Sequence, residues 1–134
     1  MAENETYPLL QSGTLSSGAH NGEKQDSTAY RGLILTADIT ASTGTSPTLT
    51  VKLQEYLPQA AAGAGRWVDV TGATTAAIDA GTPGATSLVV YPGCIAATNT
   101  YVNRPIGEHF RYVATVGGTS TPTVTCSIHA QMVL

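Results

Sequence analysis

Hydrophobic residues recur at every second position in two neighbouring parts of the chain. Residues 33–39 (LILTADI) place Leu, Leu, Ala and Ile at every second position, and residues 49–53 (LTVKL) do the same with Leu, Val and Leu. Alternation with period two puts one apolar row on a single face of a strand. The residues between the two runs include 43–47 (TGTSP), which favour a turn. The pattern therefore predicts a β-hairpin with one face in water.

Further short runs of the same kind follow, and no helical period of useful length occurs. We expect strands at 9–16, 66–70, 73–79, 85–91, 100–103, 109–116 and 123–134, separated by Gly/Pro turns at 81–84, 92–93 and 117–122. The run PQAAAGAG at 58–65 is rich in Ala, but its proline and glycines favour a loop. Seven to nine short strands with such turns predict an all-β protein, a single antiparallel β-sandwich or jelly roll.

The first 27 residues differ from the rest of the chain. They are polar and contain few large apolar groups apart from Tyr7, Leu9, Leu10 and Leu15. We expect residues 1–27 to form an extended N-terminal arm or edge segment and residues 28–134 to form the sandwich domain. On this pattern, deletion of about the first 15 residues should leave the sandwich folded. A chain of 134 residues is long enough for one domain with its own core.

The composition of the chain argues against several classes of function. Only 11% of residues are charged, the net charge is −3, and the six Lys and Arg residues form no cluster. This argues against a nucleic-acid binder. No apolar run approaches the roughly 18 residues of a membrane helix. The acidic N-terminus lacks the hydrophobic region of a secretory signal, so we expect synthesis in a cytoplasm.

Residues with catalytic or metal-binding chemistry are scattered. His20, His109 and His129 lie far apart and lack the spacing of metal ligands. The chain contains no GxSxG, phosphate loop or dinucleotide fingerprint. A glycosidase would need two converging carboxylates, which a sequence cannot show. We therefore expect no enzymatic activity, no cofactor and no metal.

The two cysteines, Cys94 and Cys126, do not have zinc-ligand spacing. Cys126 falls on an apolar row with Val124 and Ile128, which favours a small buried side chain. Cys94 follows Pro92 and Gly93 at a turn. A disulfide between the two is the alternative, but free thiols are more common in a reducing compartment.

The candidate contact residues are mainly aromatic. Trp67, the only tryptophan, shares a strand face with Asp69, so it either serves a binding surface or packs as an anchor. Tyr56, Tyr91 and Tyr101 could extend such a surface, because tyrosine is enriched at contact hot spots. His109 and Arg111 form either a recognition strip or the solvent face of a strand. With the arm, the candidate interface residues are Tyr7, Leu9, Leu10, Trp67, Tyr91, Tyr101, His109 and Arg111.

Several phrases of the sequence resemble small structural proteins of tailed bacteriophages. They are TYPLLQSGTLSSG, ADITASTGTSPTLTVKLQEY, GRWVDVTGATTAAI, LVVYPG and FRYVATVGGTSTPTVTCSI, and they cover most of the chain. The resemblance is closest to β-sandwich decoration (cement) proteins of the capsid. Such proteins commonly sit as homotrimers at three-fold or quasi-three-fold positions, where they clamp neighbouring major-capsid subunits.

The resemblance implies a non-enzymatic virion protein that binds the major capsid protein on the outer capsid surface. It also implies assembly in the host cytoplasm, without contacts to nucleic acid or membrane. Two alternatives stay open at this point. One is a tail or head–tail completion component, and the other is a carbohydrate-binding module for host attachment that uses Trp67 and nearby tyrosines.

Overall fold

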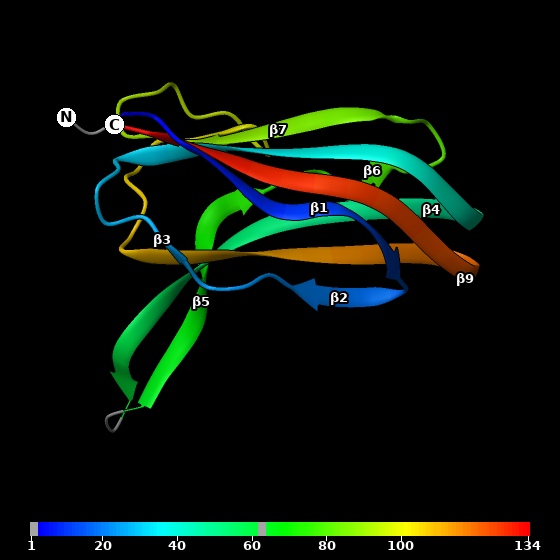
Figure 1. The fold of residues 1–134 in the computed structure, drawn as a ribbon, viewed down its shortest axis with the longest axis horizontal. Coiled ribbons are helices and arrows are strands. Elements are labelled where there is room, and N and C mark those ends of the chain that lie inside the picture. Colours follow the sequence, from blue (N-terminus) through cyan, green and yellow to red (C-terminus); the bar gives the residue numbers. More distant parts are fainter. Residues whose placement is uncertain (1–2, 62–63) are drawn as a thin grey trace.

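The computed structural model describes residues 3–61 and 64–134, which fold into strands without any helix (Figure 1). The predicted all-β class is confirmed. The strands are β1 (Thr6–Ser16), β2 (Gly18–Asn21), β3 (Gln25–Asp26), β4 (Gly32–Ala61), β5 (Ala64–Thr74), β6 (Ile78–Asp79), β7 (Gly84–Val90), β8 (Tyr101–Val102) and β9 (His109–Val133).

All nine strands belong to one open sheet. Its main path runs β1-β9-β4-β7-β8, with β2 and β3 also paired to β9 and with β5 and β6 also paired to β4. The pairs are antiparallel except β7 with β8, where Val89 lies opposite Tyr101 in a parallel ladder. The sheet is therefore mixed, not purely antiparallel as expected.

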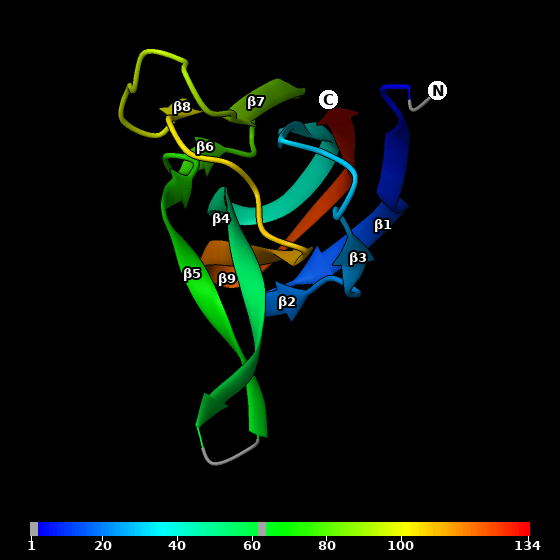
Figure 2. The ribbon, with the colours of Figure 1, turned by 90° about the vertical axis from the view of Figure 1, so that its left-hand side faces the viewer.

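The two long strands, β4 and β9, pair along almost their whole lengths. Their register runs from Gly32 opposite Val133 to Glu55 opposite Phe110. The predicted hairpin between 33–39 and 49–53 is wrong, because both runs lie in β4 and each pairs with a different half of β9. Figures 1 and 2 show both strands doubling back near their midpoints, so the sheet folds over on itself.

The doubling back coincides with the residues expected to form turns. The ladder shifts register between Thr43 and Thr48, and β-bulges of this kind bend a strand. Gly44 has φ of 92°, and an added Cβ there would lie 2.7 Å from the Cα of Pro122 on β9. Gly118 of β9 has φ of 123°. Glycine adopts positive φ without steric cost and has no Cβ, so it allows the two strands to bend while their backbones stay close together.

The folding over of the sheet creates a single core. The apolar rows of both halves of β4 and both halves of β9 join one buried cluster, represented by Leu35, Val51, Phe110 and Ile128, each at most 2% exposed. Burial of each such side chain stabilises the fold by about 1.5–3 kcal/mol. The alternation therefore predicted correctly which side chains point inward.

The N-terminal segment forms an edge of the sheet. β1 pairs with β9 from Thr6 opposite Gln131 to Ser16 opposite Thr123, and β2 and β3 pair with the first half of β9. The short strand expected at 9–16 lies within β1. Residues 6–26 thus follow the sheet edge, and the buried side chain of Leu15 joins the core.

A second extended feature is the end of the β4–β5 ladder. The loop expected at 58–65 is wrong for residues 58–61 and 64–65, which are strand, whereas residues 62–63 lie outside the described residues. Leu57 pairs with Arg66 and Ala61 pairs with Ala64. Figures 1 and 2 show this end of the ladder extending away from the body. We call residues 56–61 of β4 and 64–67 of β5 the projecting hairpin.

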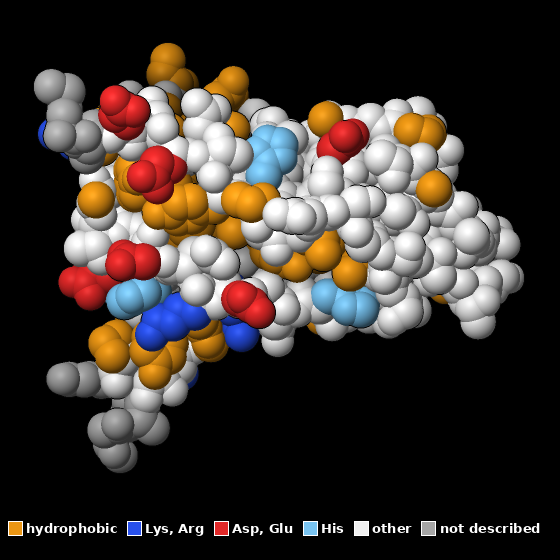
Figure 3. Space-filling view, viewed as in Figure 1, with side chains coloured by type: hydrophobic (Ala, Val, Ile, Leu, Met, Phe, Trp, Pro, Cys, Tyr) orange, Lys and Arg blue, Asp and Glu red, His pale blue; other side chains and the backbone are white. Residues whose placement is uncertain are grey.

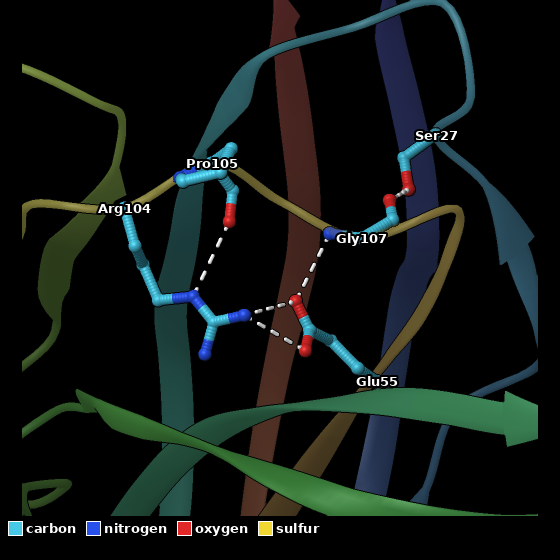
Figure 4. A network of polar contacts seen from close by, with 5 residues as sticks. All are labelled: Ser27, Glu55, Arg104, Pro105 and Gly107. Atoms are coloured by element: carbon cyan, nitrogen blue, oxygen red, sulfur yellow. Dashed lines mark hydrogen bonds and ion pairs between the residues drawn. The ribbon is translucent and has the colours of Figure 1, made fainter.

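A polar network fixes the segment between β8 and β9 near the base of the projecting hairpin (Figure 4). The Glu55 carboxylate accepts hydrogen bonds from the Arg104 guanidinium and from the backbone N–H of Gly107, each at 2.9 Å. The Ser27 hydroxyl donates to the Gly107 carbonyl. Three segments far apart in sequence are thereby joined.

Among the described residues, no helix has the length and apolar character needed to span a membrane. Within residues 3–61 and 64–134, no group of three His, Cys, Asp or Glu side chains is placed to hold a metal ion.

Candidate functional site

One outer face of the sheet gathers aromatic and charged side chains at the base of the projecting hairpin. Strict alternation places these side chains opposite the core-facing row that contains Val51 and Leu53. Lys24 reaches the same face from the segment between β2 and β3. We call this surface the aromatic–cation face, and its members are Lys24, Lys52, Gln54, Tyr56, Trp67, Asp69 and Arg111.

The rings of this face contact each other and two cations. Tyr56 and Trp67 are cross-strand neighbours, with ring centroids 5.3 Å apart and planes inclined by 52°. The Arg111 guanidinium carbon lies 4.5 Å from the Trp67 ring centroid, and Lys24 Nζ lies 4.1 Å from the Tyr56 centroid. Such cation–π contacts contribute about 0.5–1 kcal/mol each at exposed sites. They hold both rings in place on the sheet.

A row of polar contacts runs beside the rings. Arg111 Nε donates to Gln54 Oε1 at 2.8 Å, and Gln54 Nε2 donates to Asp69 Oδ1 at 2.9 Å. Lys52 Nζ lies 3.0 Å from the same carboxylate. The hydrogen bond from Gln54 and then the contact with Lys52 lower the pKa of Asp69 below its ordinary value. The row thus orients Arg111 and neutralises Lys52.

The balance of charge on this face differs from that of the whole chain. Ion pairs within 4.0 Å among the described residues are Lys52 with Asp69 and Arg104 with Glu55. No carboxylate of residues 3–61 and 64–134 lies within that distance of Lys24 or Arg111. Figure 3 shows Lys and Arg side chains beside hydrophobic ones near the base of the projecting hairpin.

Of the predicted contact residues, Trp67 and Arg111 come together on this face. His109 lies two positions before Arg111 on β9, is partly exposed and pairs with Asp26 of β3. Hydrogen bonds from Thr28 and, less strongly, the charge of His109 lower the pKa of Asp26. The recognition-strip and solvent-face interpretations of His109 and Arg111 both fit these positions.

Tyr7, Leu9 and Leu10 lie on β1, where they pack partly buried against the core. The Tyr7 ring meets Tyr30 edge-on at 6.3 Å, and its hydroxyl donates to the Asp26 carbonyl at 3.2 Å. These three residues form a different surface from the aromatic–cation face.

Tyr91 and Tyr101 lie near the β7–β8 edge. The Tyr91 hydroxyl donates to the carbonyl of Leu134, and Tyr101 is 45% exposed. Tyr101 borders an open pocket of about 420 Å³ between Thr71 and the segment 96–103. Nearby, Ile95 is 90% exposed. The structure therefore divides the predicted contact residues among three surfaces.

Sequence reasoning missed part of the aromatic–cation face. Lys52 and Gln54 carried a usable signal, because their positions alternate with the buried Val51 and Leu53. Lys24 carried none, since it lies in a segment without hydrophobic periodicity and reaches Tyr56 only through the fold.

Both cysteines are free in the structure, and Cys126 is fully buried as expected. Burial raises the pKa of the Cys126 thiol. Cys94 is partly exposed in the segment after β7. The disulfide alternative is therefore not formed.

Comparison of the chain with protein-family models, with curated proteins and with solved structures finds no match. The resemblance to phage decoration proteins therefore stays a hypothesis. What the geometry provides is a surface of rings, cations and an amide that are already ordered. Such a surface suits contact with another macromolecule, because Trp, Tyr and Arg dominate binding energy at interfaces.

Proposed function

We propose that this chain is a non-enzymatic virion structural protein that decorates the outer capsid surface and stabilises contacts between major-capsid subunits. The observation that supports this most is the partly exposed aromatic–cation face at the base of the projecting hairpin, which extends from the folded sheet (Figure 2). The phrases that resemble decoration proteins support the same proposal. In it, the chain acts as a homotrimer that assembles in the host cytoplasm and is located on the virion.

The physics of a cement protein agrees with this architecture. The proposal includes the finer fold assignment, in which the folded-over sheet is a β-sandwich or jelly roll with an N-terminal edge segment. A rigid scaffold loses little conformational entropy when it binds. Repetition on a symmetric shell then multiplies weak contacts through avidity. The projecting hairpin can reach beyond the footprint of the sheet toward a neighbouring subunit.

The direct test is the mass of the purified protein in solution by light scattering, followed by sedimentation with empty capsids. We expect a trimer that co-sediments with the capsids. A monomer that stays in the supernatant would overturn the proposal. Substitution of Trp67 by Ala should weaken co-sedimentation, whereas Thr82→Ala, at an exposed bend outside the three contact surfaces, serves as the control.

One observation favours a carbohydrate-binding module as a second candidate. Trp67 lies beside the amide of Gln54 and the carboxylate of Asp69, and saccharide sites commonly combine a ring with such groups. Against it, Arg111 already lies over the Trp67 ring, and the neighbouring Tyr56 ring is inclined rather than coplanar. Two results together would favour this second candidate: a saccharide changes the fluorescence of Trp67, and the protein does not bind capsids.

A further inference from the structure

Arg111 is oriented by the protein but keeps most of its hydrogen-bonding capacity. Its Nε donates to Gln54 and its guanidinium carbon lies 4.5 Å from the Trp67 ring centroid, and these two contacts orient the guanidinium on the sheet. Among the described residues, its two terminal amines have no hydrogen-bond partner within the protein. An arginine held in this way presents a ready fork for the two oxygens of a carboxylate.

Lys24 is the second cation that contacts the ring pair. Its ammonium lies over Tyr56, and no carboxylate of the described residues lies within 4.0 Å of it. Tyr56 and Trp67 contact each other, and each ring carries one of the two cations, Lys24 on Tyr56 and Arg111 on Trp67. This arrangement suits a segment that carries two anionic groups.

Burial of this face restricts the chemistry of any partner. Removal of water from Lys24 and Arg111 is costly unless an opposite charge meets each of them. Asp69 cannot supply that charge, because Lys52 and Gln54 already bind its carboxylate. A partner that covers the face must therefore bring its own anions.

The charge of the remaining chain favours the same conclusion. The aromatic–cation face holds three cations and one carboxylate, whereas the whole chain has a net charge of −3. The positive balance of this face therefore attracts an acidic partner and helps to orient its approach.

We infer that the aromatic–cation face binds an acidic segment of a partner protein, with one carboxylate on Arg111 and another on Lys24, beside the two rings. The inference rests on the proposed function in that it takes the partner to be a protein. It adds the chemistry of that partner and the residues that recognise it.

The test uses Trp67, the only tryptophan, as the reporter. We would titrate the full chain with a short Glu-rich peptide that contains Leu residues, and with the same peptide in which Gln replaces Glu. We expect a saturable change in Trp67 fluorescence with the Glu-rich peptide alone, weakened when salt is raised. No response, or an equal response to the Gln-rich peptide, would overturn the inference.

Three variants locate the site. Lys24→Gln and Arg111→Gln should each weaken binding of the Glu-rich peptide by about tenfold. Arg31→Gln is the matched control, because it removes the same charge from an exposed side chain outside the face. Lys24 lies outside the strands, so its variant keeps the test valid if Arg111→Gln does not fold. An equal effect of Arg31→Gln, or saturation by heparin in place of the Glu-rich peptide, would overturn the inference.

The same variants separate this inference from the proposed function. If the wild-type chain binds capsids and both Gln variants bind them equally well, the inference fails and the decoration proposal stands. If the wild-type chain binds the Glu-rich peptide at this face but no capsid, the decoration proposal fails and the inference stands.

Discussion

Arg104 donates from one guanidinium nitrogen to both carboxylate oxygens of Glu55, each 2.9 Å away (Figure 4). The Glu55 side chain is only 12% exposed, because it continues the inward-facing row of β4 beyond Leu53. A carboxylate at such a position requires partners, and Arg104 with the Gly107 N–H supplies them. The pair therefore holds the segment before β9 against β4.

The first prediction concerns this pair. Glu55→Gln keeps the side-chain volume but removes the charge, so Arg104 loses its ion pair. We expect the free energy of unfolding to fall by about 1–2 kcal/mol, a range that allows for solvent screening at the partly exposed Arg104. Urea denaturation measures it. Glu108→Gln, at an exposed position on the same segment, is the control, and an equal loss in both variants would contradict the role of the pair.

The sequence predicted the faces of the strands better than their partners. Alternation assigned Leu35, Val51 and Ile128 to the core, and all three are buried. It could not show that residues 33–39 and 49–53 each pair with β9 and do not pair with each other. An alternation with period two specifies which face of a strand is apolar but does not specify the neighbouring strand. The turn-forming residues near Gly44 and Gly118 indicated a change of chain direction at each place. That both strands bend together follows from their pairing with each other, which the sequence does not show.

Two other features depend on tertiary context. The proline and glycines of residues 58–65 indicated a loop, yet pairing between β4 and β5 makes residues 58–61 and 64–65 strand. The aromatic–cation face was predicted in part, since Trp67 and Arg111 were singled out individually. Their contact across β4 required the register of three strands, which no local pattern encodes.

The second prediction concerns the N-terminal edge. Pairing of β1 along β9 and burial of Leu15 change the expectation that truncation is harmless. Deletion of residues 1–16 should lower the unfolding free energy by at least about 2 kcal/mol from Leu15 alone. It should also promote self-association, because it opens a long edge on β9. Thermal melts and light scattering measure both effects. Deletion of residues 1–3, which leaves β1 whole, is the control, and a truncated protein as stable as this control would contradict the prediction.

The third prediction concerns thiol reactivity. Cys126 is fully buried and burial raises its pKa, whereas Cys94 is partly exposed. The thiolate is the reactive species, so Ellman's reagent should modify Cys94 in the native protein and Cys126 only after unfolding. Cys94→Ser should abolish the native reaction. Native modification of that variant would show that the core around Cys126 opens readily.

The fourth prediction concerns pH. The pKa of Asp69 is lower in the folded chain than in the unfolded one, so its contacts stabilise the fold above the unfolded value and are lost as pH falls through the folded value. Proton titration by NMR should place Asp69 below the ordinary value of about 3.9. In Gln54→Ala the pKa of Asp69 should rise, because the strongest of its hydrogen bonds is gone. An unchanged value in that variant would assign the shift to Lys52.

The last prediction tests the core that the doubled strands enclose. Val51 is fully buried in the second half of β4, and its neighbour Thr50 faces outward and is partly exposed. Val51→Asp would place a carboxylate in a packed apolar cluster that offers no cation, and such burial costs several kcal/mol, a large part of the stability of a domain of this size. We expect this variant to lose its cooperative thermal transition, as followed by circular dichroism. Thr50→Asp introduces the same group one position away and should retain the transition. A cooperative melt in both variants would mean that the two halves of the sheet do not enclose Val51.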